Sequence, residues 1–317
     1  MDAVEQRGYV CDGRLLALNS YENRVYQVGV EDGQPLVAKF YRPGRWTDAQ
    51  ILEEHEFCFE LAGQELPVVA PMRAEDTTSL SEKTIGDIRF RFALYPRKGG
   101  HAPELDRLEN LYILGRLLGR MHRIGAVKAF AHRPRIDARG FGHDSVAFIQ
   151  EHFMPRELQA SYRAITQDLL RRIDSIMAEC SNIPYIRVHG DCHVGNMLWR
   201  DDNPHFVDFD DARMAPAVQD IWMLLSGDRE QQTAQLSEIV EGYDEFYEFQ
   251  PRELKLAETL RTLRQLHYSA WLARRWEDPA FPRNFPWFNT QRYWEEHILT
   301  LREQRAALDE LPLSLNI

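Results

Sequence analysis

The first hundred residues alternate short apolar runs with polar turns, a pattern that predicts a small β-sheet. Residues 13–30 read as two strands around the polar turn "NSYEN". Residues 35–41, "PLVAKFY", follow the hairpin signal "EDG" as a third strand. Further strands are expected in residues 66–72 and 87–96. The sequence therefore predicts a β-rich first part of the chain.

One helix is expected to interrupt these strands, over residues 47–63. Thr47 or Asp48 can cap its start, and Gly63 can end it. Its apolar positions recur at helical spacing and comprise Ile51, Phe57, Cys58 and Leu61. The helix should therefore pack one face against the sheet.

The segment "RKGGHAP", residues 97–103, breaks this pattern and is interpreted as a hinge. Beyond it, residues 104–125 place apolar side chains on one helix face: Leu108, Leu111, Leu114, Leu118 and Met121. More helices are expected near 157–180, 216–226, 230–248, 251–277 and 290–308. The pattern predicts an α+β fold of two lobes, a β-rich lobe over 1–97 and a mainly helical lobe over 98–317.

A strand-loop-strand island, residues 185–212, interrupts the helices and carries the segment "VHGDCHVGNMLW". His189, Asp191 and Asn196 occur at the spacing of the protein-kinase catalytic loop H-R-D-x-x-x-x-N. In phosphoryl transfer the aspartate takes the proton of the acceptor, and the asparagine ligates magnesium. The next strand ends in Asp208 and Phe209, like the kinase D-F-G segment, with Asp210 at the glycine position. The island predicts Asp191 and Asp208 as catalytic residues and Asn196 and Asp208 as metal ligands.

Simpler interpretations exist for these polar residues. An isolated Asp and Asn often satisfy only the backbone of a turn, but the downstream Asp208 favours the catalytic interpretation. His193 can line the site or hydrogen-bond the loop, and the sequence does not decide between these roles. Cys192 is expected to be a packed small residue, with a reactive thiol as the alternative.

A kinase also needs a cation for the phosphates and a carboxylate that positions the cation. Lys39 lies on the third predicted strand, like the lysine of the kinase V-A-I-K segment. Among three nearby glutamates, Glu54 shares the apolar face of the helix, whereas Glu53 and Glu56 are expected to be solvated. The sequence thus predicts Lys39 and Glu54 as members of an ATP site.

Two departures from the kinase pattern matter. No G-x-G-x-x-G segment joins the first strands, and Ser20 in the polar turn is the candidate phosphate contact, against an ordinary turn role. Gly190 replaces the arginine of the catalytic loop, so no cation is present there to bind a phosphorylated activation loop.

Composition and charge narrow the classes of function. The net charge of −11 disfavours nucleic-acid binding, and no apolar run approaches the roughly 18 residues of a membrane helix. The N-terminus lacks the pattern of a secretory signal, and four cysteines stand far apart without a CxxC pair. We expect a cytoplasmic, monomeric protein with reduced thiols that binds neither membrane nor nucleic acid.

These motifs resemble the aminoglycoside phosphotransferase and choline kinase superfamily, whose signature is H-G-D-x-H-x-x-N followed by an I-D-F-x-D-A strand. Residues 189–196 and 207–212 match it, and "PAVQDIW" resembles the family's P-x-x-D helix start. The resemblance implies a protein-kinase-like bilobal fold. It also implies that Ser20 lies at the ATP site and that the backbone of Leu94, Tyr95 and Pro96 holds adenine.

Within this superfamily, "LNSYENRVYQV", "HGDCHVGN" and "DPAFPRNFPWF" resemble the bacterial stress response kinases. That resemblance implies a serine/threonine protein kinase that depends on ATP and Mg²⁺, autophosphorylates, and supports bacterial survival under stress. The physiological protein substrate is not readable from the sequence.

Three other functions stay open. A small-molecule kinase for an aminoglycoside or a choline-like alcohol would use the same fold. A metal-dependent hydrolase could use His189, Asp191 and His193, although no further ligand motif follows. A non-catalytic binding module is disfavoured because lysine, base and metal aspartate are all present. The Trp- and Arg-rich stretch 271–288 is interpreted as packing, with substrate recognition as the alternative.

Overall fold

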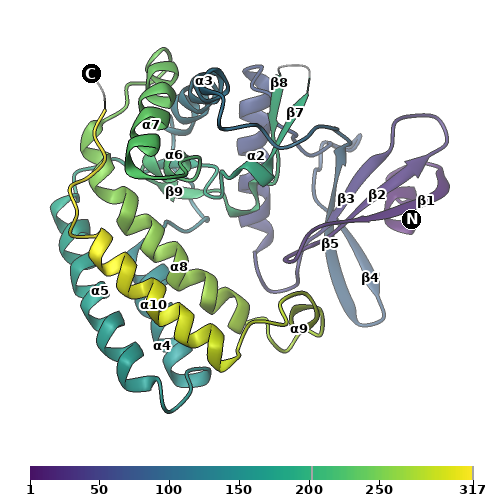
Figure 1. Cartoon of the computed structure of the whole chain (residues 1–317). Coiled ribbons are helices and arrows are strands. Elements are labelled where there is room, and N and C mark those ends of the chain that lie inside the picture. The colour runs from purple at the N-terminus through teal and green to yellow at the C-terminus, as the bar shows by residue number, and fades with distance from the viewer. Residues whose placement is uncertain (201–202, 316–317) are drawn as a thin grey trace. The chain divides into compact units, whose positions relative to one another are not determined.

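A computed structural model describes residues 1–200 and 203–315 of the chain. Its first part forms a five-stranded antiparallel sheet in the order β1-β2-β3-β5-β4 (Figure 1). The strands are β1 (Cys11–Leu18), β2 (Arg24–Val30), β3 (Leu36–Phe40), β4 (Ser81–Ile85) and β5 (Ile88–Pro96). The remainder is mainly helical, so the predicted α+β fold class is confirmed.

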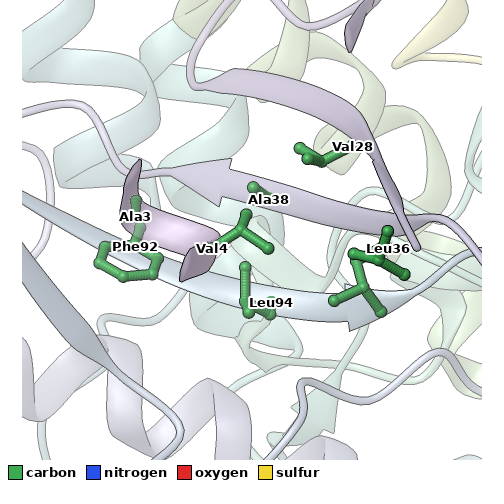
Figure 2. Close-up of a cluster of buried hydrophobic side chains, with 8 residues drawn as sticks. Ala3, Val4, Val28, Leu36, Ala38, Phe92 and Leu94 are labelled. Atoms are coloured by element: carbon green, nitrogen blue, oxygen red, sulfur yellow. The ribbon is translucent and has the colours of Figure 1, made fainter. Parts of the chain in front are cut away.

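One face of the sheet carries a hydrophobic cluster that includes the short helix α1 (Asp2–Glu5). Figure 2 shows Ala3 and Val4 of this helix against side chains of the central strands. The strand residues of the cluster are Val28, Val30, Leu36, Ala38, Phe92 and Leu94. Because side chains alternate along a strand, this arrangement turns Val37 and Lys39 of β3 to the opposite face.

Helix α2 (Asp48–Gly63) packs on that opposite face. Thr47 caps it through a hydrogen bond from the backbone N–H of Gln50, and the Gln50 side chain accepts the N–H of Thr47 in return. Ile51 lies in a buried cluster with Tyr41, Trp46 and Ala93. The predicted cap and apolar face are confirmed, and together they fix which helix residues face Lys39.

The described residues group into two compact units, each built from several segments. The first comprises residues 1–134, 186–214 and 238–248, and the second comprises 135–185, 215–237 and 249–315. The lobe boundary at residue 97 stays a prediction, because packing units and kinase lobes are different divisions of the chain.

The first unit also contains helix α3 (Leu108–Gly125), the end of α7 (Arg229–Asp244) and the strands β6 (Ile186–Val188), β7 (Met197–Arg200) and β8 (Asn203–Phe206). Strands β7 and β8 form a hairpin, and β9 (Arg213–Ala215) pairs with β6. Single 3₁₀ turns over Val194–Asn196 and Phe209–Asp211 join these strands. Asn196 lies in the first turn, Asp208 directly precedes the second, and Asp191 lies in the loop between β6 and the first turn.

The second unit is helical. It holds a π-helical turn at Ala138–His143 and a 3₁₀ segment at Pro251–Leu256. Its helices are α4 (Asp144–His152), α5 (Gln159–Glu179), α6 (Val218–Trp222), α8 (Ala257–Ala273), α9 (Ala280–Asn284) and α10 (Gln291–Ala307). Within the stretch 271–288, Phe281, Phe285 and Phe288 are buried, whereas Trp287 is exposed. Packing therefore accounts for part of that stretch.

Several expected elements differ from the structure. Residues 66–72 form no strand but a single bridge between Val68 and Phe206, because Pro67 and Pro71 lack the N–H groups a ladder needs. Leu108 is exposed, whereas the other four positions of its predicted face are fully buried. The short elements α1, β4, α4 and α9 were not predicted.

The residues that the structure describes contain neither a membrane-spanning helix nor a disulfide. None of their helices is both long enough and apolar enough to cross a bilayer. The four cysteines all lie within residues 1–200, and none of them forms a disulfide.

Candidate active site

The centre of the site is Lys39, a buried ammonium that faces three carboxylates. Its Nζ lies 2.9 Å from Oδ1 of Asp208 and 3.2 Å from Oδ1 of Asp210. Oε1 of Glu54 is farther away, at 3.9 Å. Burial alone would lower the pKa of Lys39, but the three carboxylates raise that pKa well above its usual range. Lys39 therefore stays charged, as a phosphate-binding cation must.

Glu54 is confirmed as the glutamate of α2 that points inward, since its side chain is only 2% exposed. Its second oxygen, Oε2, lies 3.1 Å from Nη2 of Arg133. Burial raises the pKa of Glu54 to about 7, and the charges of Lys39 and Arg133 oppose that rise. Glu54 thus connects the lysine of the sheet to an arginine that no motif indicated.

Asp210 is the carboxylate that the sequence interpretation left without a role. It is buried, and its Oδ2 lies 2.6 Å from Nη1 of Arg45. Burial would raise the pKa of Asp210, but Arg45 and Lys39 lower it to about 2. Asp210 therefore stays ionised and pairs with two cations, Lys39 and Arg45.

Asp191 is held by the side chains of two later residues of the same motif, His193 and Asn196. The Asn196 side chain donates from Nδ2 to the backbone carbonyl of Asp191 at 2.9 Å and to its carboxylate at 3.3 Å. His193 Nδ1 accepts the backbone N–H of Gly195, so the proton of a neutral ring is on Nε2. That Nε2 lies 3.4 Å from Oδ2 of Asp191. His193 thus contacts both the loop backbone and the carboxylate.

His189 supports the loop from the interior of the protein, where its ring is fully buried. Nε2 donates to the carbonyl of Val207 at 2.9 Å, and Nδ1 accepts the backbone N–H of Asp191 at 3.3 Å. Both ring nitrogens are therefore engaged. This places His189 as a structural link between the catalytic loop and the strand that leads to Asp208.

Asp208 has a backbone conformation that non-glycine residues rarely adopt. Its φ is 58° and its ψ is 66°, in the left-handed region, at the start of the turn Phe209–Asp211. Such conformations occur preferentially at functional sites, where the surrounding structure holds them. The side chain is 48% exposed while Lys39 holds one of its oxygens. Its carboxylate can therefore reach a ligand.

Asn196 and Asp208 both line one cavity and fit the donor chemistry of a magnesium site. Since Nδ2 of Asn196 donates to Asp191, its Oδ1 is the atom that can ligate a cation. No group of three or more His, Cys, Asp or Glu side chains poised to hold a metal occurs within residues 1–200 and 203–315. Two protein ligands are typical of Mg²⁺, which takes its other ligands from phosphates and water.

The cavity has a volume of about 410 Å³, within the range of small-molecule sites. Apolar side chains from the sheet, from the segment 66–72 and from β7 line it, namely Leu18, Val25, Val37, Val69 and Leu198. Ser20, Tyr95 and Pro96 line it as well, and Ser20 Oγ accepts the backbone N–H of Asn23 at 3.3 Å. Leu94 instead lies in the core cluster of the other sheet face, and its carbonyl accepts the N–H of Met72. The adenine-binding role of this segment stays a prediction.

The structure corrects the predicted role of one of the other two glutamates of α2. Glu53 is not simply solvated, because its carboxylate accepts the backbone N–H groups of Ala131, His132 and Arg133. Glu56 is exposed, as expected. The hydrolase hypothesis loses support, since backbone groups engage both ring nitrogens of His189, namely the carbonyl of Val207 and the N–H of Asp191.

The sequence interpretation missed three residues of this cluster: Arg45, Arg133 and Asp210. The sequence could have indicated Asp210, because it lies only two residues after Asp208, the predicted metal ligand. Arg45 and Arg133 had none, because their contacts to residues 208–212 join segments far apart in the chain.

Comparison with known proteins agrees with this geometry. Residues 14–257 match the Phosphotransferase enzyme family. The chain is 45% identical to "Stress response kinase A" of Escherichia coli strain K12 over 316 residues, which cover 99% of this chain and 94% of that protein. It is 44% identical to "Serine/threonine protein kinase RdoA" of Salmonella typhimurium strain LT2 over 318 residues, with the same coverage of both chains.

Solved structures of phosphotransferases share the fold. The amicoumacin kinase hAmiN, in complex with AMP-PNP, Ca²⁺ and Ami, superposes with a TM-score of 0.74 at 18% identity, over 99% of this chain and 94% of that chain. A microcompartment-associated aminopropanol kinase superposes with a TM-score of 0.71 at 16% identity, over 98% and 97% of the two chains. Together, the matched family and the close relatives show that the chain is an enzyme that belongs to the phosphotransferase enzyme family.

Proposed function

We propose that this phosphotransferase is an ATP- and Mg²⁺-dependent serine/threonine protein kinase that autophosphorylates and acts in the cytoplasm during bacterial stress. The observation that carries the proposal is the ion pair between Lys39 and Asp208 on the wall of the cavity that Asn196 also lines. The names of the relatives at 44–45% identity favour a protein as the acceptor.

In the proposed reaction, Asp191 accepts the proton of a serine or threonine hydroxyl. The hydroxyl oxygen forms a bond to the γ-phosphorus of ATP, the bond from that phosphorus to the β–γ bridging oxygen breaks, and ADP leaves. Asn196 and His193 hold the Asp191 carboxylate in place for this step. Lys39 contributes a fixed positive charge for the phosphates.

A magnesium ion held by Asn196 Oδ1 and the Asp208 carboxylate would neutralise charge on the phosphates. The apolar residues of the cavity and the backbone near Tyr95 would hold the adenine. Ser20 would contact phosphate from the turn between β1 and β2. All of these assignments concern residues within the first unit.

The test compares acceptors directly. The protein is incubated with γ-labelled ATP and Mg²⁺, either alone, with dephosphorylated casein, or with choline, ethanolamine and an aminoglycoside. We expect label on serine and threonine of casein and of the enzyme itself, with no stimulation by the small molecules. Label on a small molecule and none on protein would overturn the protein-kinase proposal and support the small-molecule alternative.

A further inference from the structure

Arg133 joins helix α2 to the segment that follows the metal-binding aspartate. Its side chain is fully buried, with Nη2 3.1 Å from Oε2 of Glu54. Nη1 donates to two backbone carbonyls, those of Asp210 at 2.9 Å and Ala212 at 2.8 Å. A single planar guanidinium therefore fixes the distance between Glu54 and residues 208–212.

Residues 131–133 are themselves bound to the first turns of α2. The carboxylate of Glu53 accepts the N–H groups of His132 at 2.9 Å and Arg133 at 2.8 Å, in addition to that of Ala131. Arg133 Nε donates to the carbonyl of Gln50 at 2.8 Å, and Gln50 Nε2 donates to the carbonyl of His132 at 3.0 Å. The helix thus cannot rotate without breaking these hydrogen bonds and the buried contact between Arg133 and Glu54.

The catalytic loop leaves no room for the arginine that kinases use at this place. Gly190 has a φ of +82°, and a Cβ added there would lie 2.2 Å from the carbonyl oxygen of Asp211. The segment after Asp208 therefore packs its backbone directly on the loop. Asp211 is held further by Arg45 at 2.8 Å and by Arg213 at 3.2 Å.

We propose that Arg133 is a positioning residue that locks α2 and residues 208–212 in the arrangement needed for phosphoryl transfer, without phosphorylation of the chain. In kinases with a loop arginine, a phosphate on a flexible segment supplies this order. Here the carbonyls of Asp210 and Ala212 take the place of that phosphate as acceptors of an arginine. This inference rests on the proposed roles of Lys39, Glu54 and Asp208.

The first test is Arg133→Lys, which keeps the charge but loses the planar fork. We expect kcat to fall about 100-fold, because small displacements of catalytic groups are costly, with the KM for ATP changed less than about threefold. The matched control is Arg123→Lys, an exposed arginine of α3, which should keep the parent kcat. A folded Arg133→Lys protein with the parent kcat would overturn the proposal.

Hydrogen exchange gives a readout that needs no acceptor. In Arg133→Lys, backbone amides of residues 51–57 and 208–214 should exchange faster than in the parent, whereas strands β1 and β2 should not change. Unchanged exchange in both segments would overturn the proposal that Arg133 holds α2 and residues 208–212 in place. If Arg133→Lys does not fold, the double variant Arg133→Gln/Glu54→Gln removes both buried charges and serves for the exchange measurement.

The second test uses the unaltered enzyme. After treatment with a phosphatase and its removal, the enzyme should start without a lag and at the rate of the untreated sample. A lag that disappears as the chain becomes phosphorylated would overturn the proposal. If label goes only to a small alcohol, the protein-kinase proposal fails, and the same rates are measured with that alcohol, so the two failures are distinguishable.

Discussion

Lys39 and Asp208 stand 169 residues apart in the chain, and their side chains meet at 2.9 Å. A cation from the sheet and a carboxylate from the turn after β8 thus share the wall of one cavity. Asp210 and Glu54 add negative charge around the same ammonium. The site is therefore a compact network of charges, buried except for Asp208, in which each member depends on its neighbours.

Replacement of the lysine tests this network first. Lys39→Met keeps the length of the side chain but removes the charge that we propose binds the phosphates. We expect the rate of phosphoryl transfer to fall at least about 100-fold, the range seen when one fixed electrostatic contact to a transition state is removed. Steady-state kinetics check this, with Lys83→Met, a partly exposed lysine of the edge strand β4, as the control. Parent-like activity in Lys39→Met would contradict the assignment.

Asp210→Asn tests the residue that the motifs did not assign. The change leaves Arg45 and Lys39 with less compensation in a buried site, so we expect a loss of about 3 kcal/mol in the free energy of unfolding. Urea denaturation measures it. Glu56→Gln removes the exposed pair with Arg73 and should cost less than about 1 kcal/mol. Equal, small losses in both variants would mean that Asp210 is not a structural ion of the site.

His193→Ala tests whether the histidine positions the carboxylate of Asp191. The loss of its contact at 3.4 Å should lower kcat about tenfold and leave the KM for ATP nearly unchanged, since in the proposed reaction the ring holds the base and does not bind the nucleotide. Initial rates at varied ATP separate the two constants. His152→Ala, an exposed histidine of the second unit, is the control. An unchanged kcat in His193→Ala would restrict the histidine to shaping the loop.

The sequence predicted the parts of the fold that follow from local periodicity. Helix α2 shows this well: its cap at Thr47, its apolar face and the inward direction of Glu54 all follow from spacing. Residues 66–72 show the limit, because an apolar run interrupted by two prolines makes only one bridge to Phe206. A strand needs partners that local sequence does not name.

The site was predictable where a motif records it and not elsewhere. Asp191, Asn196, Asp208 and Lys39 occur in known spacings, and the last three line the same cavity. Arg133 was not predicted, because its partners, Glu54 and the carbonyls of Asp210 and Ala212, lie 77 to 79 residues away in the chain. The role of Glu53 was not predicted, because its carboxylate accepts N–H groups of residues 131–133, whose loop conformation the local sequence does not indicate.

Stability should depend on pH through Glu253, a glutamate of the second unit outside the proposed site. Burial raises the pKa of Glu253 to about 7, although its carboxylate accepts the backbone N–H of Val218. The folded state therefore favours the protonated form. Between roughly pH 4.5 and 7 the folded state binds more protons than the unfolded state, so this group's stabilising contribution is lost as pH rises.

The measurement compares the parent with Glu253→Gln at pH 5.5 and pH 8. The parent should lose about 2 kcal/mol more than the variant over this range, from the difference between the folded and unfolded pKa values. Urea unfolding at each pH gives the numbers. A parallel response of both proteins would show that Glu253 does not titrate in this window.

The most direct test of the whole account is the rate of Asp191→Asn. Asparagine keeps the size of the side chain but cannot accept the hydroxyl proton, so kcat should fall about 10³-fold, within the range for loss of a general base. The dissociation constant for ATP should change less than about threefold, because in the proposed reaction Asp191 acts on the acceptor and not on the nucleotide. Transfer by Asp191→Asn at the parent rate, with bound ATP unchanged, would contradict the assignment of Asp191 as the proton acceptor.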